Sequence, residues 1–154
     1  MSNPDVIVLG AGGVGSATIY QLARRGVRVL GLDRFPAAHA LGSSHGQTRL
    51  IRLAYYEHPD YVPLVTHAYQ RWRELEVETG RSLLSSCGLI QVGPESGEVI
   101  RGVLQSAQDY QLDAEALSHQ QLVERFPQFN IPENVVGAWE PDAGYLRVES
   151  CVEA

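Results

Sequence analysis

The clearest gap in this 154-residue sequence is lysine, because all twelve of its basic residues are arginine. A role that demands a lysine ammonium group must therefore be filled from outside this chain. Cysteine is also scarce, and Cys87 and Cys151 lack the close spacing of a metal site. We interpret them as buried or unpaired thiols in a reducing compartment, and we expect a cytoplasmic protein that binds no metal.

The sequence also has too little positive charge for binding nucleic acid, and its apolar runs are too short for spanning a membrane. The net charge is −6 and the isoelectric point is near 5.3, which gives no electrostatic case for binding nucleic acid or an anionic membrane. No apolar stretch approaches the roughly 20 residues of a membrane-spanning helix, and the first residues lack the positive charge of a secretory signal. We expect neither a nucleic-acid nor a membrane partner, and the oligomeric state stays open.

The N-terminal part contains a glycine-rich loop between two short apolar runs. The first run is Val6–Leu9, and the second covers residues 27–32 and is followed directly by Asp33. The loop that follows the first run reads Gly10-Ala11-Gly12-Gly13-Val14-Gly15. Apolar residues at helical spacing lie between the runs, so the segment has the G-x-G-x-x-G fingerprint of a dinucleotide-binding strand–helix–strand unit. We predict that Val6–Leu9 and Val29–Leu32 are adjacent parallel strands.

Each part of this fingerprint has a physical task. Gly10 allows a sharp turn out of the strand, Gly12 lets a pyrophosphate approach the backbone, and Gly15 lets the helix pack closely against the sheet. Unpaired N–H groups and the helix dipole favour a doubly charged pyrophosphate at the start of the helix. Asp33 can accept hydrogen bonds from both hydroxyls of an adenosine ribose. These residues predict a dinucleotide site, and they fit NAD and FAD equally.

Beyond Asp33 the sequence departs from repeated strand–helix units. Residues 42–49 are small and polar, which is typical of a turn or a short helix start. Periodicity and stop residues predict helices over 61–79, 99–110 and 118–126, strands over 89–92, 135–139 and 144–146, and a helix beginning at Val148. Two parallel strands are normally buried within a larger sheet. We therefore expect an α/β fold that is incomplete: a Rossmann-like βαβ unit followed by α+β segments.

The most specific motif follows the βαβ unit. It reads Gly42-Ser43-Ser44-His45-Gly46-Gln47-Thr48-Arg49-Leu50-Ile51-Arg52. Together with the fingerprint it resembles the sarcosine oxidase family of flavoenzymes, which includes N-methyltryptophan and pipecolate oxidases within the wider D-amino-acid-oxidase-like group. The resemblance extends through Phe126-Pro127 and through the segment from Glu140 to Leu146. It identifies residues 1–154 as the N-terminal part of an FAD-dependent oxidoreductase domain, with a cofactor unit over 5–33 and a substrate region from about residue 80.

The resemblance implies a reaction. Members of that family bind FAD and remove hydride from the carbon next to the nitrogen of a secondary amino acid; the imine is hydrolysed, and O₂ reoxidises the flavin to give hydrogen peroxide. FAD, an amino-acid substrate and O₂ are therefore the expected partners. The resemblance covers roughly the first two-fifths of a family member. The family's flavin-linking cysteine, its lysine for O₂ reduction and its second carboxylate-binding residue lie in the later part, so we expect this chain alone to be inactive.

Single residues acquire roles from the same resemblance. The glycine loop, Asp33 and Arg34 are assigned to FAD, with the loop and Asp33 on its ADP half. Further residues approach the flavin ring: Ser43, Ser44, His45, Thr48 and Arg49. Arg52 matches the arginine that holds the substrate carboxylate, a role that suits a planar guanidinium able to form a two-bonded fork. Arg52, Arg49 and His45 are the residues expected at the reaction itself.

Simpler interpretations exist for several of these residues. His45 could bond a backbone carbonyl within its loop, and Arg49 and Arg52 could form a solvated basic face. Their apolar neighbours favour partly buried arginines that need anionic partners. No motif surrounds the other histidines, which we interpret as surface residues: His39, His58, His67 and His119. For the whole chain the alternatives are an NAD-dependent Rossmann dehydrogenase and a non-catalytic nucleotide-binding remnant.

Overall fold

The computed structural model describes residues 3–154 and divides the chain into two compact units. The first unit comprises the residues up to Arg49 together with Leu75–Leu83 and Leu146–Ala154. The second comprises Leu50–Glu74 and Leu84–Tyr145. Each unit is therefore assembled from segments that are far apart in the sequence.

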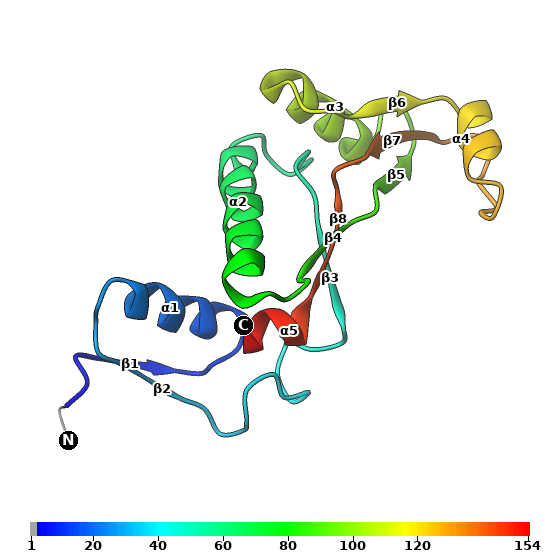
Figure 1. The fold of residues 1–154 in the computed structure, drawn as a ribbon. Helices are drawn as coiled ribbons and strands as arrows, with labels where there is room; N and C mark the ends of the chain where they lie inside the picture. Colours follow the sequence, from blue (N-terminus) through cyan, green and yellow to red (C-terminus); the bar gives the residue numbers. More distant parts are fainter. Residues whose placement is uncertain (1–2) are drawn as a thin grey trace. The chain divides into compact units, whose positions relative to one another are not determined.

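A parallel strand pair with one helix begins the first unit. Strand β1 (Val6–Leu9) pairs with β2 (Val29–Leu32) in parallel, and Val6 lies opposite Val29. Helix α1 (Gly13–Arg24) connects the strands and lies along them (Figure 1). The predicted parallel pair is confirmed, and its glycine loop begins at the carboxyl end of β1.

Two glycines of the loop are required by the geometry. Gly10 has a φ of 92°, a left-handed conformation that glycine adopts without strain. A Cβ atom at Gly15 would lie 1.8 Å from the carbonyl oxygen of Gly10, so any side chain there would push α1 away from the turn. The turn and packing tasks inferred from the sequence are confirmed for these two positions.

The remaining segments of the first unit pack beside α1. They are the end of helix α2 (Tyr61–Thr79) and helix α5 (Val148–Glu153), which contacts α1. The hydroxyl of Tyr20 on α1 donates to the Glu78 carboxylate at 2.6 Å. Arg81 forms an ion pair with Glu153 on α5 at 3.2 Å. These contacts hold residues from both ends of the chain in one unit.

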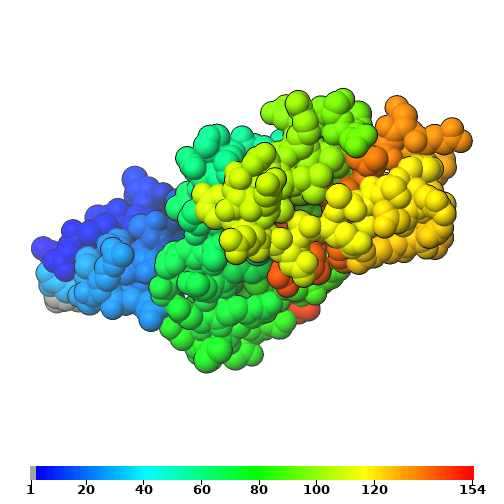
Figure 2. All heavy atoms as spheres, turned by 90° about the horizontal axis from the view of Figure 1, so that it is seen from above, coloured from blue at the N-terminus to red at the C-terminus, as the bar shows by residue number. Residues whose placement is uncertain are grey.

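An antiparallel sheet forms the centre of the second unit. Its strand order is β5 (Leu89–Gly93), β7 (Val136–Glu140) and β6 (Glu115–Leu117). Helix α3 (Glu98–Tyr110) packs on this sheet (Figure 1). The hydrophobic core of the second unit comprises Ala54, Ile100, Val103 and Ala138. Helix α4 (His119–Arg125) begins with a capping box between Ser118 and Gln121. Figure 2 shows α3 in yellow-green and α4 in yellow on an exposed face of this unit.

Three short strands form the third sheet, in the order β3 (Thr48–Ile51), β8 (Gly144–Arg147) and β4 (Leu84–Ser86). The boundary between the units falls within β3 and within β8. The turn or helix start predicted up to residue 49 is wrong for Thr48 and Arg49, which begin β3. A strand of four residues is stabilised by its partners, and the partner β8 lies almost a hundred residues later, beyond the reach of a local pattern.

The fold class expected from the sequence is confirmed: a parallel pair with its helix is followed by α+β segments. Helices α2, α3 and α4 match the predicted ranges within about one residue, and β7, β8 and α5 begin where they were expected within one residue. The sequence patterns missed β3, β4 and β6, which have three or four residues each. Within residues 3–154, none of the helices is long and apolar enough to cross a membrane.

Candidate functional site

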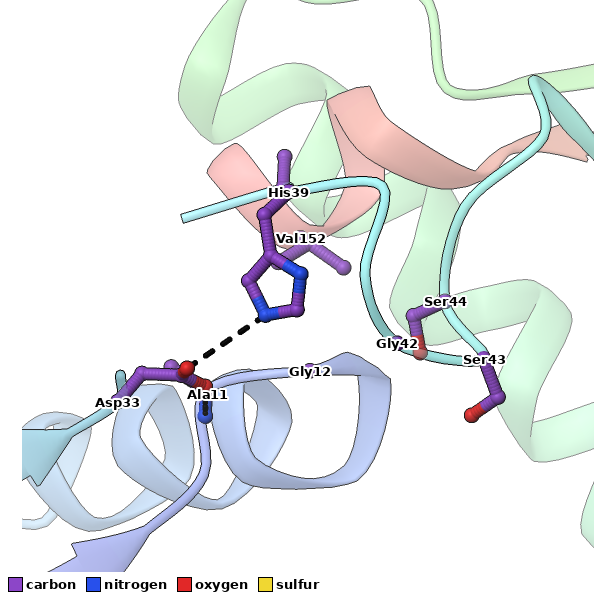
Figure 3. A pocket seen from close by; sticks show the side chains of 9 residues that line it. Ala11, Gly12, Asp33, His39, Gly42, Ser43, Ser44 and Val152 are labelled. Carbon is purple, nitrogen blue, oxygen red and sulfur yellow. Dashed lines mark hydrogen bonds and ion pairs between the residues drawn. The ribbon is translucent and has the colours of Figure 1, made fainter. Parts of the chain in front are cut away.

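A cavity of about 220 Å³ opens beside the glycine loop in the first unit (Figure 3). It lies where the β1–α1 turn, the end of β2 and the loop that precedes β3 meet. Its lining comprises Ala11, Gly12, Asp33, Ala38, His39, Gly42, Ser43, Ser44 and Val152. The structure therefore brings together the fingerprint and the start of the second motif, which the sequence could only place in succession.

Asp33 is held at the wall of this cavity by backbone N–H groups. One carboxylate oxygen accepts the N–H of Ala11 at 2.7 Å, and the other accepts the N–H of Phe35 at 3.1 Å. These bonds, that of Ala11 most, lower the pKa of the Asp33 carboxyl below its usual value. Asp33 is therefore ionised at neutral pH, and a carboxylate of this kind can accept hydrogen bonds from ligand hydroxyls.

Ser44 lies at the N-terminus of α1. Its hydroxyl oxygen accepts the N–H of Gly13 at 2.9 Å, one of the groups that a helix leaves without an internal partner. A Cβ atom at Gly12 would lie 3.4 Å from this oxygen, and one at Gly13 would lie 3.1 Å from it. The absence of side chains at Gly12 and Gly13 thus leaves room for the second motif directly against the helix start.

His39 corrects an interpretation made from the sequence. It is not a surface residue: its side chain is 21% exposed and lies in the cavity, with Nε2 3.5 Å from an Asp33 oxygen (Figure 3). Its Nδ1 accepts the N–H of Leu41 at 3.0 Å, and its ring meets the Phe35 ring edge-on. The loop fold brings His39 to Asp33, and no periodicity or motif in the sequence signals that approach.

Glu149 on α5 anchors the loop that contains the second motif. Its carboxylate accepts the N–H groups of Gly46 at 2.8 Å and of Gln47 at 3.0 Å. These bonds, that of Gly46 most, lower the pKa of Glu149. The sequence did not single out Glu149, because its partners lie about a hundred residues earlier.

Arg49 departs from the expectation for a partly buried arginine. It is exposed, and its guanidinium donates to the carbonyl oxygens of Thr48, at 2.7 Å, and of Ser43. These partners are neutral carbonyls instead of the anionic partner that we expected. The prediction of an anionic partner is therefore wrong for Arg49.

The other residues expected in the first unit are exposed. His45 lies in the loop, and Thr48 begins β3 and donates its N–H to the Gly46 carbonyl at 2.8 Å. Val14, in the first turn of α1, is 85% exposed. Arg34 follows Asp33, and its guanidinium stacks over the Phe35 ring at 5.3 Å. Their assignments to the reaction or to FAD stay predictions.

Arg52 lies in the second unit, directly after β3, and meets the expectation of a partly buried arginine. Its side chain is 18% exposed, and Nη2 donates to both oxygens of Glu57 at 2.8 and 3.0 Å. Its guanidinium carbon lies 4.5 Å from the Tyr55 ring centre and 5.4 Å from that of Tyr56. The Nε atom of Arg52 is buried and has no hydrogen-bond partner among residues 3–154. A buried donor in this state favours a ligand with an acceptor oxygen.

Glu140, at the end of β7, holds the backbone that follows Arg52. It is 2% exposed, and its two oxygens accept the N–H groups of Leu53 at 2.5 Å and of Ala54 at 3.1 Å. Burial raises the pKa of Glu140, and these N–H groups oppose that rise.

No cluster of three or more metal-binding side chains occurs within residues 3–154.

The cavity residues fit the ADP half of FAD. An ionised carboxylate at the end of β2 suits ribose hydroxyls, and the start of α1, which lacks side chains at Gly12 and Gly13, suits a pyrophosphate. Arg52, with a buried Nε–H, suits a carboxylate. Both features agree with the chemistry expected from the sequence.

Known proteins are similar in sequence to this chain over nearly its full length. N-methyl-L-tryptophan oxidase from Yersinia pestis (strain Pestoides F) is 42% identical over 149 residues, which cover 97% of this chain and 40% of that protein. N-methyl-L-tryptophan oxidase from Yersinia pseudotuberculosis (serotype O:1b) matches to the same extent. The chain thus spans about two-fifths of the length of the curated relatives it matches.

Solved structures share the fold. A variant of NikD, described as an unusual amino acid oxidase essential for nikkomycin biosynthesis, has a TM-score of 0.86 and 29% identity over 99% of this chain and 40% of that chain. Glycine oxidase from Bacillus cereus has a TM-score of 0.73 at 21% identity, covering 98% of this chain and 42% of that chain, which shows the fold alone.

A family model decides between the two cofactors that the fingerprint left open. Residues 5–154 match the model described as FAD dependent oxidoreductase. This match confirms the resemblance inferred from the two motifs, and FAD as the family's cofactor in place of NAD. By its sequence, its βαβ unit and this match over residues 5–154, the chain belongs to the family of FAD-dependent oxidoreductases.

Proposed function

We propose that the protein containing this chain is an oxidase of a secondary or N-methylated amino acid, which forms an imine and hydrogen peroxide. The single observation that carries this proposal is Arg52, partly buried and with an unpartnered Nε–H, directly after the second motif. The 42% identity with N-methyl-L-tryptophan oxidase supports the same class of substrate. An amino acid and O₂ are the proposed small-molecule partners.

The first unit would hold the cofactor, with a cofactor unit over residues 5–33. Asp33 would accept the ribose hydroxyls, and the start of α1 would bind the pyrophosphate. Four further residues are proposed to contact FAD: Arg34, Ser43, Ser44 and Thr48. Bound FAD would supply the hydride acceptor, and O₂ would take the electrons to give hydrogen peroxide. Apart from Arg52, the substrate region would begin near residue 80.

Arg52 would bind and orient the substrate. Its Nε–H is without a partner, and it forms a two-bonded fork with an N–H of Nη2, so a substrate carboxylate would accept from Nε and would share Nη2 with Glu57. A two-bonded carboxylate fixes the direction of the α-carbon, and this positioning contributes to the rate. Arg49 and His45 would add positive charge and polar contacts beside the reacting groups.

The test uses the full natural polypeptide that contains this chain. We expect a flavin absorbance spectrum after purification and peroxide release with N-methyl amino acids. A colourless protein that reduces NAD with a substrate would overturn the proposal in favour of a dehydrogenase. A cytoplasmic location is also a proposal, which rests on the two unpaired cysteines.

For the 154-residue chain alone we propose binding of the cofactor's ADP half without turnover. The reason is that the chain spans about two-fifths of the relatives' length and contains no lysine. Purified residues 1–154 can be mixed with FAD and sarcosine while thermal unfolding and peroxide are followed. Peroxide release together with a flavin-stabilised cooperative transition would overturn this second proposal.

A further inference from the structure

Glu140 is the one charged side chain that is buried within residues 3–154. Taking a carboxylate out of water is costly unless hydrogen bonds and nearby positive charge compensate. Neither the motifs nor the proposed reaction gives Glu140 a task. Its position in the second unit therefore calls for a reason beyond packing.

The bonds of Glu140 are concentrated on the backbone next to Arg52. The N–H of Leu53 belongs to the same planar peptide group as the carbonyl of Arg52. Because Glu140 accepts this N–H at 2.5 Å and the N–H of Ala54 at 3.1 Å, the peptide plane on the carboxyl side of Arg52 is held. This restricts the ψ angle of Arg52.

Tyr69 holds the peptide group on the other side of Arg52. Its hydroxyl lies 3.2 Å from the carbonyl oxygen of Ile51, which belongs to the peptide group ending at the Arg52 nitrogen. The same hydroxyl lies 3.2 Å from the carbonyl oxygen of Asp142, two residues after Glu140. Both backbone angles of Arg52 are thus restrained by side chains, and the direction of its Cα–Cβ bond follows from them.

The charge of Glu140 adds to the geometry. Burial raises its pKa, whereas the two N–H bonds and the positive charge of Arg52 act in the opposite direction. Arg52 and Glu140 therefore attract each other through a poorly hydrated region. A glutamine could keep one of the two backbone bonds, but it would lose this attraction.

We propose that Glu140 is a positioning residue for Arg52, which sets the guanidinium in the orientation that a substrate carboxylate requires. This inference rests on the proposed function, in which Arg52 binds that carboxylate. Glu140 itself touches neither substrate nor cofactor, and its effect passes through the backbone of Leu53 and Ala54. Tyr69 is the second residue that restrains the backbone of Arg52, through the carbonyl of Ile51.

The experiment compares two substrates in the full natural polypeptide: an N-methyl amino acid and its amide, which lacks the carboxylate. We expect Glu140→Gln to raise the KM for the acid on the order of tenfold and to leave the KM for the amide within about twofold. Flavin content should stay at the wild-type level. The dissociation constant of acetate, measured through the absorbance of the bound flavin, should rise by a similar factor. Glu76→Gln is the control, because Glu76 accepts the backbone N–H of Leu83 in the first unit.

Two further variants keep the inference testable. Glu140→Asp retains the charge and should keep part of the preference for the acid, and Tyr69→Phe should weaken acid binding alone. If Glu140→Gln fails to fold, these two variants decide: unchanged acid-to-amide KM ratios in both would overturn the inference. Equal effects of Glu140→Gln on acid and amide would also overturn it. If Arg52→Lys leaves the ratio unchanged, the proposed role of Arg52 fails, whatever the Glu140 variants do.

Discussion

Two carboxylates, one in each unit, bind the backbone in the same way and differ in acidity. Asp33 accepts the N–H groups of Ala11 and Phe35, and Glu140 accepts those of Leu53 and Ala54. The pKa of Asp33 is lowered by its bonds, whereas the pKa of Glu140 is raised by burial. The same bonding pattern therefore gives opposite shifts because the loss of water differs.

The difference in exposure separates a carboxylate that a ligand can contact from one that contacts only the backbone beside Arg52. Asp33 lines an open cavity and keeps contact with solvent, so a ribose can share its oxygens. Glu140 bonds the backbone through both oxygens as Asp33 does, but it is 2% exposed, so a ligand cannot reach those oxygens. Substitutions of the two residues should accordingly affect different measurements.

The largest effect is expected for Glu140→Leu in the full natural polypeptide. The N–H groups of Leu53, partly buried, and of Ala54, buried, lose their acceptor, so the free energy of unfolding should fall by about 2–4 kcal/mol. Chemical denaturation measures the change. Asp33→Ala, measured without added FAD, should have a much smaller effect. Equal losses of stability in the two variants would remove the contrast.

Arg52→Lys should affect substrate binding next most strongly. It keeps the charge but loses the planar fork, so the KM for an N-methyl amino acid should rise on the order of tenfold while flavin content stays near normal. Steady-state kinetics and the absorbance spectrum test both parts. Arg71→Lys, at an exposed ion pair with Glu74, is the matched control. Unchanged kinetics for carboxylate substrates would contradict the proposed role.

Asp33→Ala should act on the cofactor instead of on the substrate. Loss of a charged acceptor should weaken FAD binding on the order of tenfold, as measured by fluorescence titration of the apoprotein. Asp5→Ala removes an exposed carboxylate of the same unit, which pairs with Arg28 at 2.5 Å, and should leave FAD affinity unchanged. Equal affinities of the two variants would show that Asp33 has no special place in FAD binding.

The smallest effect is a difference in pH dependence. An ionised Glu140 is disfavoured in the folded protein, so its contribution to stability falls as pH rises from its ordinary pKa of 4.5 through the raised value. Glu140→Gln should therefore make stability less dependent on pH just above 4.5. Asp33 has the opposite sign: its contribution is present above 3.8 and is lost as pH falls through its lowered pKa. Denaturation curves from pH 3 to pH 7 test both; identical slopes in wild type and Glu140→Gln would contradict the assignment.

Much of the fold could be predicted because its causes are local. The βαβ unit is specified within 33 residues by glycine spacing and apolar periodicity, and α4 by its capping residue Ser118. The short strands β3, β4 and β6 were not predicted, because three or four residues are too few to show an alternation of apolar and polar residues. Their stability comes from partner strands that are distant in the sequence. Arg52 was expected to be a partly buried arginine, which the structure shows, and its role at the substrate, assigned by resemblance, stays a prediction.

The sequence by itself determined the parallel pair, the turn at Gly10 and the close packing at Gly15, because steric limits act between near neighbours along the chain. Only the tertiary structure decided that His39 lies beside Asp33 and that Arg49 bonds carbonyls. Only the tertiary structure placed Glu140 on the backbone of Leu53 and Ala54, which lie 87 and 86 positions earlier in the sequence. Hydrogen bonds over such separations depend on how whole segments pack, and no local pattern of residue types records them.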